Sequence, residues 1–334
     1  MNASESLVLS FLAQSGLRRC QALLASLSFF IFVPSCSRVP TTIAVIPRAC
    51  GTALWEPEHA GATHVARRKG MNVYWNAPPR EDDVAGQIAL LEKVVARGYA
   101  GIIITPDQTL PLRTPIRRLV SGGIPIVVVG TNLGITPTAK LSYVLNDDTA
   151  GGQMAARRVG KILRGRGSIA ILGINPQLTG ITARERSFEN TLEQEYPNIR
   201  VVARRLGYYS VPQEQQVAED ILNRGEAVDA IVALSHISTR GAFYALVEFD
   251  KTQAIKLVGF DQDLMPPIRT GGIDSVIMER TYDMGRTAME FMDAQIHGRT
   301  VPGISVVPPI LMTRENIDSS EIRQQLTANW WAAQ

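Results

Sequence analysis

The chain has 334 residues, of which 45% are hydrophobic and 6% aromatic, the composition of an ordinary globular α/β protein. Lys and Arg number 34 against 31 Asp and Glu, so the net charge at pH 7 is only +3. Nucleic-acid-binding proteins usually carry a strongly basic face, so nucleic acid is excluded as a predicted partner. The three cysteines, Cys20, Cys36 and Cys50, fit neither a metal cluster nor a disulfide framework, and no metal or cofactor is predicted.

The first 36 residues differ from the rest of the chain. Arg18-Arg19 precede an apolar run at 22–33, which is too short to span a bilayer and has the length of an export-signal core. The run ends at Val33-Pro34-Ser35-Cys36, which resembles the lipobox of bacterial lipoproteins. We therefore predict a lipoprotein-type signal peptide over 1–36, with Cys36 acylated at the mature N-terminus. The alternative is an uncleaved membrane anchor.

Strands and helices alternate over the next hundred residues, which favours a parallel sheet with right-handed crossovers. The apolar runs are nearly continuous, as expected for strands covered on both faces. The predicted strands are Thr42–Ile46, Met71–Trp75, Ala100–Thr105 and Ile124–Val129. The predicted helices are Glu58–Lys69, Val84–Ala96 and one around Pro115 to Val120.

A second round of the same alternation begins at Ser168. Its predicted strands are Ser168–Leu172, Arg200–Ala203 and Asp229–Leu234, and its predicted helices are Arg186–Glu195, Gln213–Arg224 and Thr239–Phe249. The segment 96–105 parallels 223–234, because each closes a helix with Arg-Gly and then enters a strand. The sequence therefore predicts two similar α/β lobes in tandem, facing one another across a cleft.

Two further strands each deliver a carboxylate at the end of an apolar run. The strand Lys256–Phe260 ends on Asp261, and the strand Ser275–Met278 ends on Glu279. Between them the chain breaks at Met265-Pro266-Pro267, and a helical pattern starts near Tyr282. Open α/β sheets present ligand groups at the carboxyl ends of their strands.

Polar or aromatic residues recur at the ends of the predicted strands, and together they predict a concave binding site. A Trp ring stacks on the C–H face of a sugar, while carboxylates and Arg hold hydroxyls in defined geometry. The candidate ligand-binding residues are Thr52, Trp55, Thr105, Asp107, Thr131, Asn132, Arg184, Ser235, Asp261 and Glu279.

No pattern of an enzyme accompanies these residues. There is no dinucleotide fingerprint, phosphate-binding loop or paired-cysteine metal spacing. Ser235 and His236 are adjacent at a strand end, but adjacent residues rarely reach nucleophile–base geometry and no nucleophile elbow surrounds them. We therefore predict no catalytic residues, and a protein that binds its ligand without changing it.

Several motifs between Thr42 and Ile317 resemble the type I periplasmic binding proteins, particularly the ribose-binding-like branch. GTALWEPEHAGA resembles the family's aromatic ligand loop and places Trp55 on its stacking residue. ARERSF carries the family's arginine at Arg184, LVGFDQD its ligand carboxylate at Asp261, and IMERTYDMG its last hinge segment, where Glu279 replaces a usual glutamine. Gly130 and Ser235 replace a usual Asp and Asn, so the resemblance implies a polar ligand without specifying ribose.

The resemblance implies two Rossmann-like lobes with parallel sheets, a three-strand hinge near Asp147, Arg280 and Pro308, and a ligand cleft between the lobes. The implied N-terminal lobe is 37–147 plus 281–308, and the C-terminal lobe is 148–280 plus 309–334. It further implies an exported sugar receptor, a lipid-anchored monomer of the periplasm or cell envelope, that delivers a monosaccharide-like carbohydrate to the permease of an ABC importer.

Two other functions compete. A periplasmic sensor that passes its ligand-bound state to a membrane kinase or chemoreceptor would share the same site. A transcriptional regulator with this ligand-binding fold would need a helix-turn-helix domain ahead of the first lobe, whereas the residues there resemble an export signal.

Overall fold

The computed structural model describes residues 41–225, 227–262 and 264–329. These residues belong to one compact unit of the chain, Pro40–Gln334, built on two six-stranded sheets. The predicted export signal, with Cys36, lies outside the described residues. Among the helices of the described ranges, none is long and apolar enough to cross a membrane.

The first sheet has the strand order β11-β5-β4-β3-β1-β2, and every neighbouring pair is parallel. Strands β3 and β4 are buried along their whole length, because helices cover both faces of the sheet. The strands are β1 (Thr42–Ile46), β2 (Asn72–Trp75), β3 (Gly101–Ile104), β4 (Ile126–Val129), β5 (Leu141–Asn146) and β11 (Ile304–Val307). We call this sheet and its helices the first lobe.

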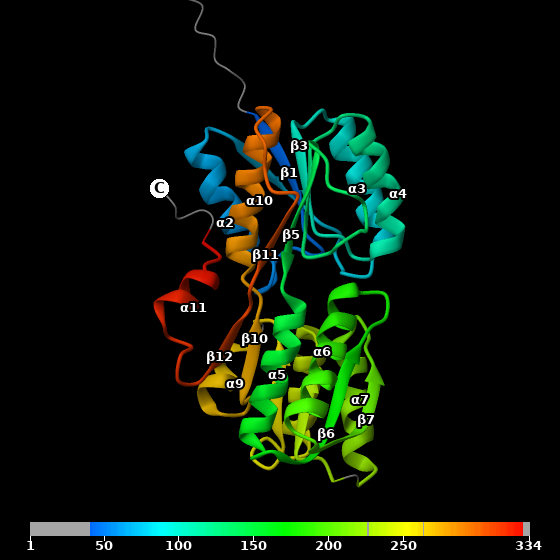
Figure 1. Cartoon of the computed structure of the whole chain (residues 1–334), viewed down its shortest axis with the longest axis vertical. Helices are drawn as coiled ribbons and strands as arrows, with labels where there is room; N and C mark the ends of the chain where they lie inside the picture. The colour runs from blue at the N-terminus through cyan, green and yellow to red at the C-terminus, as the bar shows by residue number, and fades with distance from the viewer. Residues whose placement is uncertain (1–40, 226, 263, 330–334) are drawn as a thin grey trace, which may run out of the picture. The chain divides into compact units, whose positions relative to one another are not determined.

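Helices α2 and α10 pack on one face of the first sheet, and α3 and α4 pack on the other (Figure 1). They are α2 (Glu56–Arg68), α3 (Val84–Ala96), α4 (Thr109–Ser121) and α10 (Thr281–Ile296). Two glycines allow α2 and α10 to approach closely. A Cβ atom on Gly61 would lie 2.0 Å from the carbonyl oxygen of Tyr282, and one on Gly285 would lie 2.1 Å from that of Glu58.

The second sheet has the order β12-β10-β9-β8-β6-β7, in which only β12 is antiparallel to its neighbour. Its strands are β6 (Arg166–Ile174), β7 (Asn198–Leu206), β8 (Ala230–Ala233), β9 (Lys256–Phe260), β10 (Ser275–Met278) and β12 (Ile310–Thr313). Its helices are α5 (Asp148–Ile162), α6 (Thr179–Glu195), α7 (Val211–Asn223), α8 (His236–Glu248), α9 (Met265–Thr270) and α11 (Ser320–Gln325). We call this sheet and these helices the second lobe. The predicted fold class of two α/β lobes with parallel sheets is confirmed.

The predicted correspondence between the lobes is visible in their backbone. Helix α3 in the first lobe and α7 in the second each end at an Arg-Gly pair. Gly98 and Gly225 follow these helices with the same φ of +68°. A left-handed residue after a helix favours glycine, because a Cβ atom would be strained there. The repeated Arg-Gly pair is therefore one structural device used twice.

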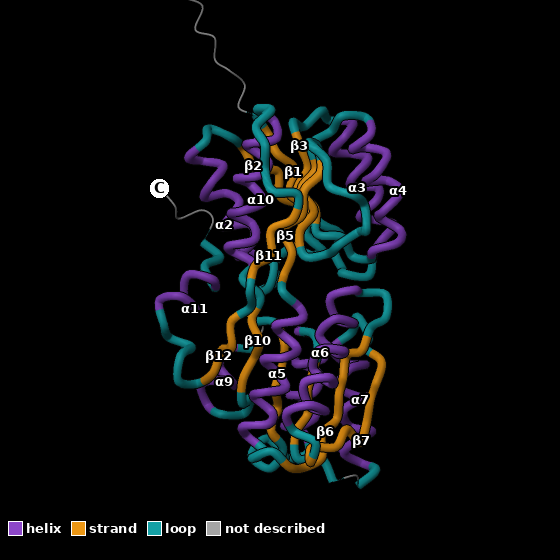
Figure 2. Tube along the Cα trace, viewed as in Figure 1, coloured by secondary structure: helices purple, strands orange, loops and turns teal. Residues whose placement is uncertain are grey.

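The chain passes between the two sheets three times (Figure 2). The crossings follow β5 at Asp147, follow β10 at Arg280 and join β11 to β12 at Pro308-Pro309. The Asp147 N–H donates to the carbonyl oxygen of Val307 at 3.0 Å, so the first and third crossings lie side by side. The three crossings lie at the places where the resemblance to the family predicts the hinge strands.

Two helices begin more than one turn earlier than the sequence predicts. Helix α6 begins at Thr179 instead of Arg186, and α4 at Thr109 instead of near Pro115. Gly180 has low helix propensity, but Leu178 and Ile181 are buried in the core of the second lobe. Burial of these apolar side chains outweighs the weak local preference and lengthens α6.

A short helix, α9, replaces the simple chain break expected at Met265-Pro266-Pro267. Proline is tolerated in the first turn of a helix, because the N–H that it lacks would have no partner inside the helix. Gly271 then ends the helix in the left-handed conformation, with φ of +83°. The two prolines therefore begin a helix here instead of preventing one.

Candidate functional site

A cavity lies where the carboxyl ends of the strands of both sheets meet, and both lobes supply side chains to its wall. The first lobe contributes Arg48, Trp55, Glu81 and Thr131. These residues come from the segments that follow β1, β2 and β4. The parallel sheet thus brings side chains from three distant parts of the sequence to one wall.

The second lobe contributes the hydroxyl of Ser235 and most of the charged groups of the wall: Asp148, Arg184, Glu214, His236, Asp261 and Glu279. Asp261 and Glu279 directly follow β9 and β10, and Ser235 is the second residue after β8. Six of the ten sequence-predicted residues line the cavity, namely Trp55, Thr131, Arg184, Ser235, Asp261 and Glu279.

Arg184, on α6, is the centre of a buried ion cluster. Its Nε atom donates to Oδ1 of Asp148 at 2.7 Å, and its Nη1 atom lies 3.3 Å from Oδ1 of Asp261. Its Nη2 atom donates to the carboxylate of Glu279. Nη1 also donates to the carbonyl oxygen of Leu234 at 3.0 Å. One guanidinium group, 4% exposed, therefore faces three carboxylates.

The cluster shifts the pKa values of its members. Burial opposes the charged form of Arg184, but Asp261, Asp148 and Glu279 together raise its pKa above the usual range. Burial and the charge of Asp261 raise the pKa of Glu279 to about 8, although Arg184 acts in the opposite direction. A single cation therefore does not compensate three carboxylates in this environment, and a pKa of about 8 means that Glu279 is mostly protonated at neutral pH.

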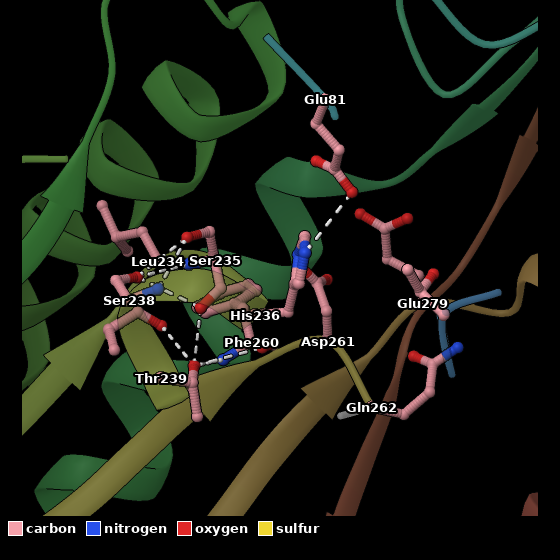
Figure 3. A network of polar contacts seen from close by, with 12 residues as sticks. Glu81, Leu234, Ser235, His236, Ser238, Thr239, Phe260, Asp261, Gln262 and Glu279 are labelled. Carbon is pink, nitrogen blue, oxygen red and sulfur yellow. Dashed lines mark hydrogen bonds and ion pairs between the residues drawn. The ribbon is translucent and has the colours of Figure 1, made fainter. Parts of the chain in front are cut away.

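Asp261 has an unusual backbone conformation at the end of β9. Its φ is +64°, the left-handed region that non-glycine residues rarely adopt, and only 4% of the residue is exposed. Its N–H donates to the carbonyl oxygen of Ile277 at 2.9 Å. The neighbouring Phe260 N–H donates to Oγ1 of Thr239 at 3.1 Å (Figure 3). Strained residues of this kind cluster at binding sites, where the surrounding structure holds them in place.

Ser235 lines the cavity and also begins α8. Its Oγ atom accepts from the backbone N–H of Ser238 at 3.2 Å, and the Ser238 Oγ atom accepts from the Ser235 N–H at 3.0 Å (Figure 3). This reciprocal pair is a capping box, which satisfies two N–H groups at the start of the helix. The capping box fixes the position of the next residue, His236, at the cavity wall.

Glu81 connects the two lobes within the cavity. Its Oε1 atom accepts from the indole Nε1 of Trp55 at 2.7 Å and lies 3.4 Å from Nε2 of His236. The other ring nitrogen of His236, Nδ1, lies 3.9 Å from Oδ2 of Asp261. Figure 3 shows Glu81 and His236 pointing toward one another, with Asp261 beside the imidazole ring. Burial alone would raise the pKa of Glu81, but His236, Arg48 and Trp55 lower it to about 2.

Arg48 and Thr131 close the wall on the side of the first lobe. The Arg48 Nη2 atom donates to Oγ1 of Thr131 at 3.0 Å, and its Nε atom donates to the carbonyl oxygen of Pro106 at 3.0 Å. Gly130, which precedes Thr131, has φ of +73°. The Arg48 guanidinium also lies 5.7 Å from the centre of the Trp55 ring. These contacts hold Arg48 in a defined orientation at the cavity.

Four predicted residues do not line the cavity, and two of them stabilise loops. The Oγ1 atom of Thr52 accepts from the N–H of Trp55 at 3.1 Å, which holds the turn that starts α2. The Oδ1 atom of Asn132 accepts from the N–H of Gly134 at 2.8 Å in the loop after β4.

The other two, Thr105 and Asp107, are fully buried beneath the end of β3. The hydroxyl of Thr105 donates to the carboxylate of Glu58 at 3.3 Å. The N–H of Asp107 donates to Oε1 of Gln87 at 2.9 Å, and neither carboxylate oxygen has a hydrogen-bond partner among the described residues. Burial raises the pKa of Asp107 to about 8, although Arg48 opposes this shift.

Sequence reasoning missed five charged residues of the cavity wall, namely Arg48, Glu81, Asp148, Glu214 and His236. Arg48 is the second residue after β1, so the strand-end pattern that selected Thr52 could have selected it. Glu81 lies in the charged run 80–83, which is typical of an exposed loop. That Ser235 and His236 are not expected to form a catalytic dyad does not exclude binding, because a histidine at a strand end can also line a binding site.

Two parallel-sheet lobes with a shared cavity at their strand ends and three chain crossings define a bilobal ligand-binding protein. Residues 43–300 match the model of the periplasmic binding protein domain. The chain therefore belongs to the periplasmic binding protein family. Two relatives are named as binding proteins, for D-allose and for the import of ribose, in agreement with the prediction of a binding protein.

Similar proteins include the D-allose-binding periplasmic protein of Escherichia coli, 23% identical and covering 78% of this chain and 86% of its own. The D-apiose import binding protein of Paraburkholderia graminis is also 23% identical, with coverage of 83% and 88%. Among solved structures, a carbohydrate transporter solute-binding protein from Agrobacterium radiobacter in complex with D-arabinose has a TM-score of 0.80 at 23% identity, covering 87% of this chain and 100% of its own. The structural likeness supports the fold, and the two relatives are named for binding D-allose and for the import of D-apiose.

Proposed function

We propose that this protein captures a monosaccharide-like carbohydrate in the cavity and delivers it to an ABC importer. One observation carries the proposal: both lobes supply buried polar side chains and the first lobe an indole ring to a single cavity. Such a wall can hold hydroxyl groups and a sugar ring together, whereas an apolar ligand would leave these polar groups without partners. The relatives named for D-allose and D-apiose support the same ligand class.

The side chains can divide the recognition of a sugar among them. Carboxylates of Asp261 and Glu279 accept hydrogen bonds from hydroxyl groups, and Arg184 donates to ring or hydroxyl oxygens. The ring of Trp55, whose orientation Glu81 holds, packs on the C–H face of the sugar. Thr131 and Ser235 supply further hydroxyl groups at the wall. Thr52, Thr105, Asp107 and Asn132 receive no ligand contact in this proposal, since none lines the cavity.

We further propose that the three crossings form a hinge between the lobes. On this view the first lobe is 37–147 plus 281–308, the second is 148–280 plus 309–334, and a ligand contacting both favours the closed arrangement. Small-angle scattering of the protein with and without a bound sugar tests the hinge. A radius of gyration that does not fall on binding would contradict it.

The family and the sequence support a proposal for the location and partners of the protein. Relatives are periplasmic and import-related by name, so we place this chain in the periplasm or cell envelope as a monomer that meets a membrane permease. The lipobox-like Val33-Pro34-Ser35-Cys36 supports attachment through a lipid on Cys36.

The ligand itself can be identified directly. The protein is purified under native conditions, denatured, and the released small molecule is analysed by mass spectrometry. We expect a carbohydrate from the wild type and its loss from Asp261→Ala. Release of a compound of another chemical class from the wild type would overturn the proposal.

A further inference from the structure

The charged groups of the cavity wall are not balanced. Five carboxylate side chains line the cavity, from Glu81, Asp148, Glu214, Asp261 and Glu279. The lining cations are two guanidinium groups, those of Arg48 and Arg184, together with the titratable His236. When all five carboxylates are ionised, the wall therefore carries an excess of negative charge among the described residues, even with His236 protonated.

The contacts within the wall do not remove this excess. Arg184 is shared by three carboxylates, and Arg48 donates to Thr131 and to a backbone carbonyl instead of to an acid. His236 lies 3.4 Å from Glu81. Buried carboxylates without matching positive charge are costly, because the protein interior solvates them poorly. A positively charged ligand would supply the missing charge.

A second observation, on a different element, also indicates a donor from the ligand. Glu214, in the first turn of α7, is fully buried and lines the cavity. Its Oε1 atom accepts from the backbone N–H of Tyr208 at 2.6 Å, but its Oε2 atom has no hydrogen-bond partner among the described residues. A buried acceptor of this kind is normally satisfied, so Glu214 keeps an unused acceptor at the cavity wall.

From these contacts we infer that the preferred ligand of the cavity is an amino-bearing sugar or cyclitol, whose ammonium group is held by the carboxylates around Arg184, with Glu279 as its main partner. The inference rests on the proposed function and specifies the substrate class of the same site. An ammonium group brings three hydrogen-bond donors and one positive charge. The charge would balance the ionised carboxylates of the wall, and the donors would satisfy their acceptor atoms. A neutral sugar would bring the donors without the charge.

An inorganic cation fits the wall less well than an ammonium group does. Among the described residues no three His, Cys, Asp or Glu side chains are arranged to hold a metal ion. Protonation of the carboxylates is the other way to reduce the negative charge of the wall. Burial raises the pKa of Glu279 to about 8 and that of Glu214 to about 7, so both acids bind protons near neutral pH. A ligand ammonium would replace these protons, so binding near pH 7 should release protons to the buffer.

Isothermal titration of the wild type with matched pairs of ligands tests the inference. Suitable pairs are D-glucosamine with D-glucose, D-galactosamine with D-galactose, and an aminodeoxy-inositol with its parent inositol. We expect the amino member of at least one pair to bind about tenfold to a hundredfold more tightly than its neutral partner, from one additional charged hydrogen bond. Repeating that titration in two buffers of different ionisation enthalpy should show proton release.

Two variants with the same change in net charge identify the group responsible. Glu279→Gln should reduce the preference for the amino member over the neutral member by about tenfold, because glutamine keeps an acceptor oxygen and loses the charge. Glu290→Gln removes an exposed carboxylate, paired with Arg286 on α10, and should keep the preference of the wild type. The affinities of the two members of a pair are also compared on the wild type, and that comparison does not require either variant to fold.

The outcomes separate this inference from the function on which it rests. If the neutral sugars bind as tightly as their amino partners in every pair, the ligand class is wrong, while sugar capture still stands. If no member of any pair binds, the amino-bearing ligand class is wrong, whereas sugar capture is tested separately by the mass of the co-purified ligand. A preference for the amino member that survives in Glu279→Gln would contradict the role given to Glu279.

Discussion

The carboxylate of Glu81, in the loop between β2 and α3, lies 3.4 Å from Nε2 of His236 at the start of α8. This ion pair joins a side chain of the first lobe to one of the second, and the same carboxylate also holds the indole of Trp55. A polar link between the lobes is therefore built into the cavity wall itself. It is expected to contribute to stability as well as to the shape of the site.

The lowered pKa of Glu81 predicts a specific loss of stability in acid. Although burial opposes the shift, His236 and Arg48 bring this pKa from 4.5 to about 2. A carboxyl group with a lowered pKa stabilises the fold above its ordinary pKa, and this contribution is lost as the pH falls through the folded value. Between pH 6 and pH 3 the wild type should lose about 2 kcal/mol more unfolding free energy than Glu81→Gln does.

Urea denaturation of both proteins at the two pH values measures this difference. Glu248→Gln, which changes an exposed residue at the end of α8, serves as the control and should follow the wild type. Equal losses in the wild type and in Glu81→Gln would show that the pair with His236 contributes nothing to stability.

Glu279 predicts the opposite dependence on pH. Burial and the charge of Asp261 raise its pKa to about 8, so the folded protein favours the neutral acid. The stability associated with this group is complete below its ordinary pKa of 4.5 and is lost as the pH rises through 8. Glu279→Gln mimics the neutral form and should melt a few °C higher than the wild type at pH 9, with little difference at pH 5. Thermal melts of both proteins at the two pH values check this; a lower Tm for the variant at pH 9 would contradict it.

Close packing of α2 on α10 predicts a large cost for one added methyl group. In Gly61→Ala the new Cβ atom would lie 2.0 Å from a backbone oxygen of Tyr282, so the helices must separate. Overpacking of this kind costs about 1–3 kcal/mol. In the control Gly151→Ala, the nearest atom would be a side-chain carbon of Phe260 at 3.2 Å, which can move by a few tenths of an ångström. Chemical denaturation should therefore show a clearly larger loss for Gly61→Ala; equal losses would contradict the packing argument.

Local patterns in the sequence were sufficient for the lobes and for part of the site. Apolar runs and Arg-Gly pairs mark the strands and helices of both lobes. These patterns depend only on residues that are neighbours in the sequence, so they can be recognised without the structure. Asp261 and Glu279 could be selected from sequence, since the carboxyl ends of parallel strands lie at one edge of a sheet.

The direction of a side chain and the packing of a loop cannot be read from these patterns. Asp107 follows β3 much as Asp261 follows β9, yet it is buried beneath the strand end, where its N–H donates to Gln87. Glu81 lies in a charged run typical of exposed loops, and only its contacts with Trp55 and His236 bring it to the cavity. Both outcomes depend on residues far away in the sequence.

Lipid attachment gives a prediction that does not depend on the fold. If Cys36 is acylated, Cys36→Ser should release the protein from the membrane fraction into the soluble fraction, because the anchor is lost. The mass of the Cys36→Ser protein should also be lower than expected for a lipid-modified protein, because no lipid is attached. Cys50→Ser, at an exposed thiol, is the control and should remain with the membrane. Membrane association of Cys36→Ser together with an unprocessed precursor mass would favour an uncleaved anchor instead.

Calorimetric titration of Asp261→Ala with sugars tests the central claim most directly. Its control is Asp250→Ala, because Asp250 is also left-handed, with φ of +49° against +64° for Asp261, but is exposed after α8. Both variants should therefore carry a similar backbone cost from an alanine in this conformation. With a pentose or hexose that the wild type binds, we expect Asp261→Ala to lose about tenfold to a hundredfold in affinity and Asp250→Ala to keep it. Unchanged affinity in a folded Asp261→Ala would contradict the assignment of this cavity as the sugar site.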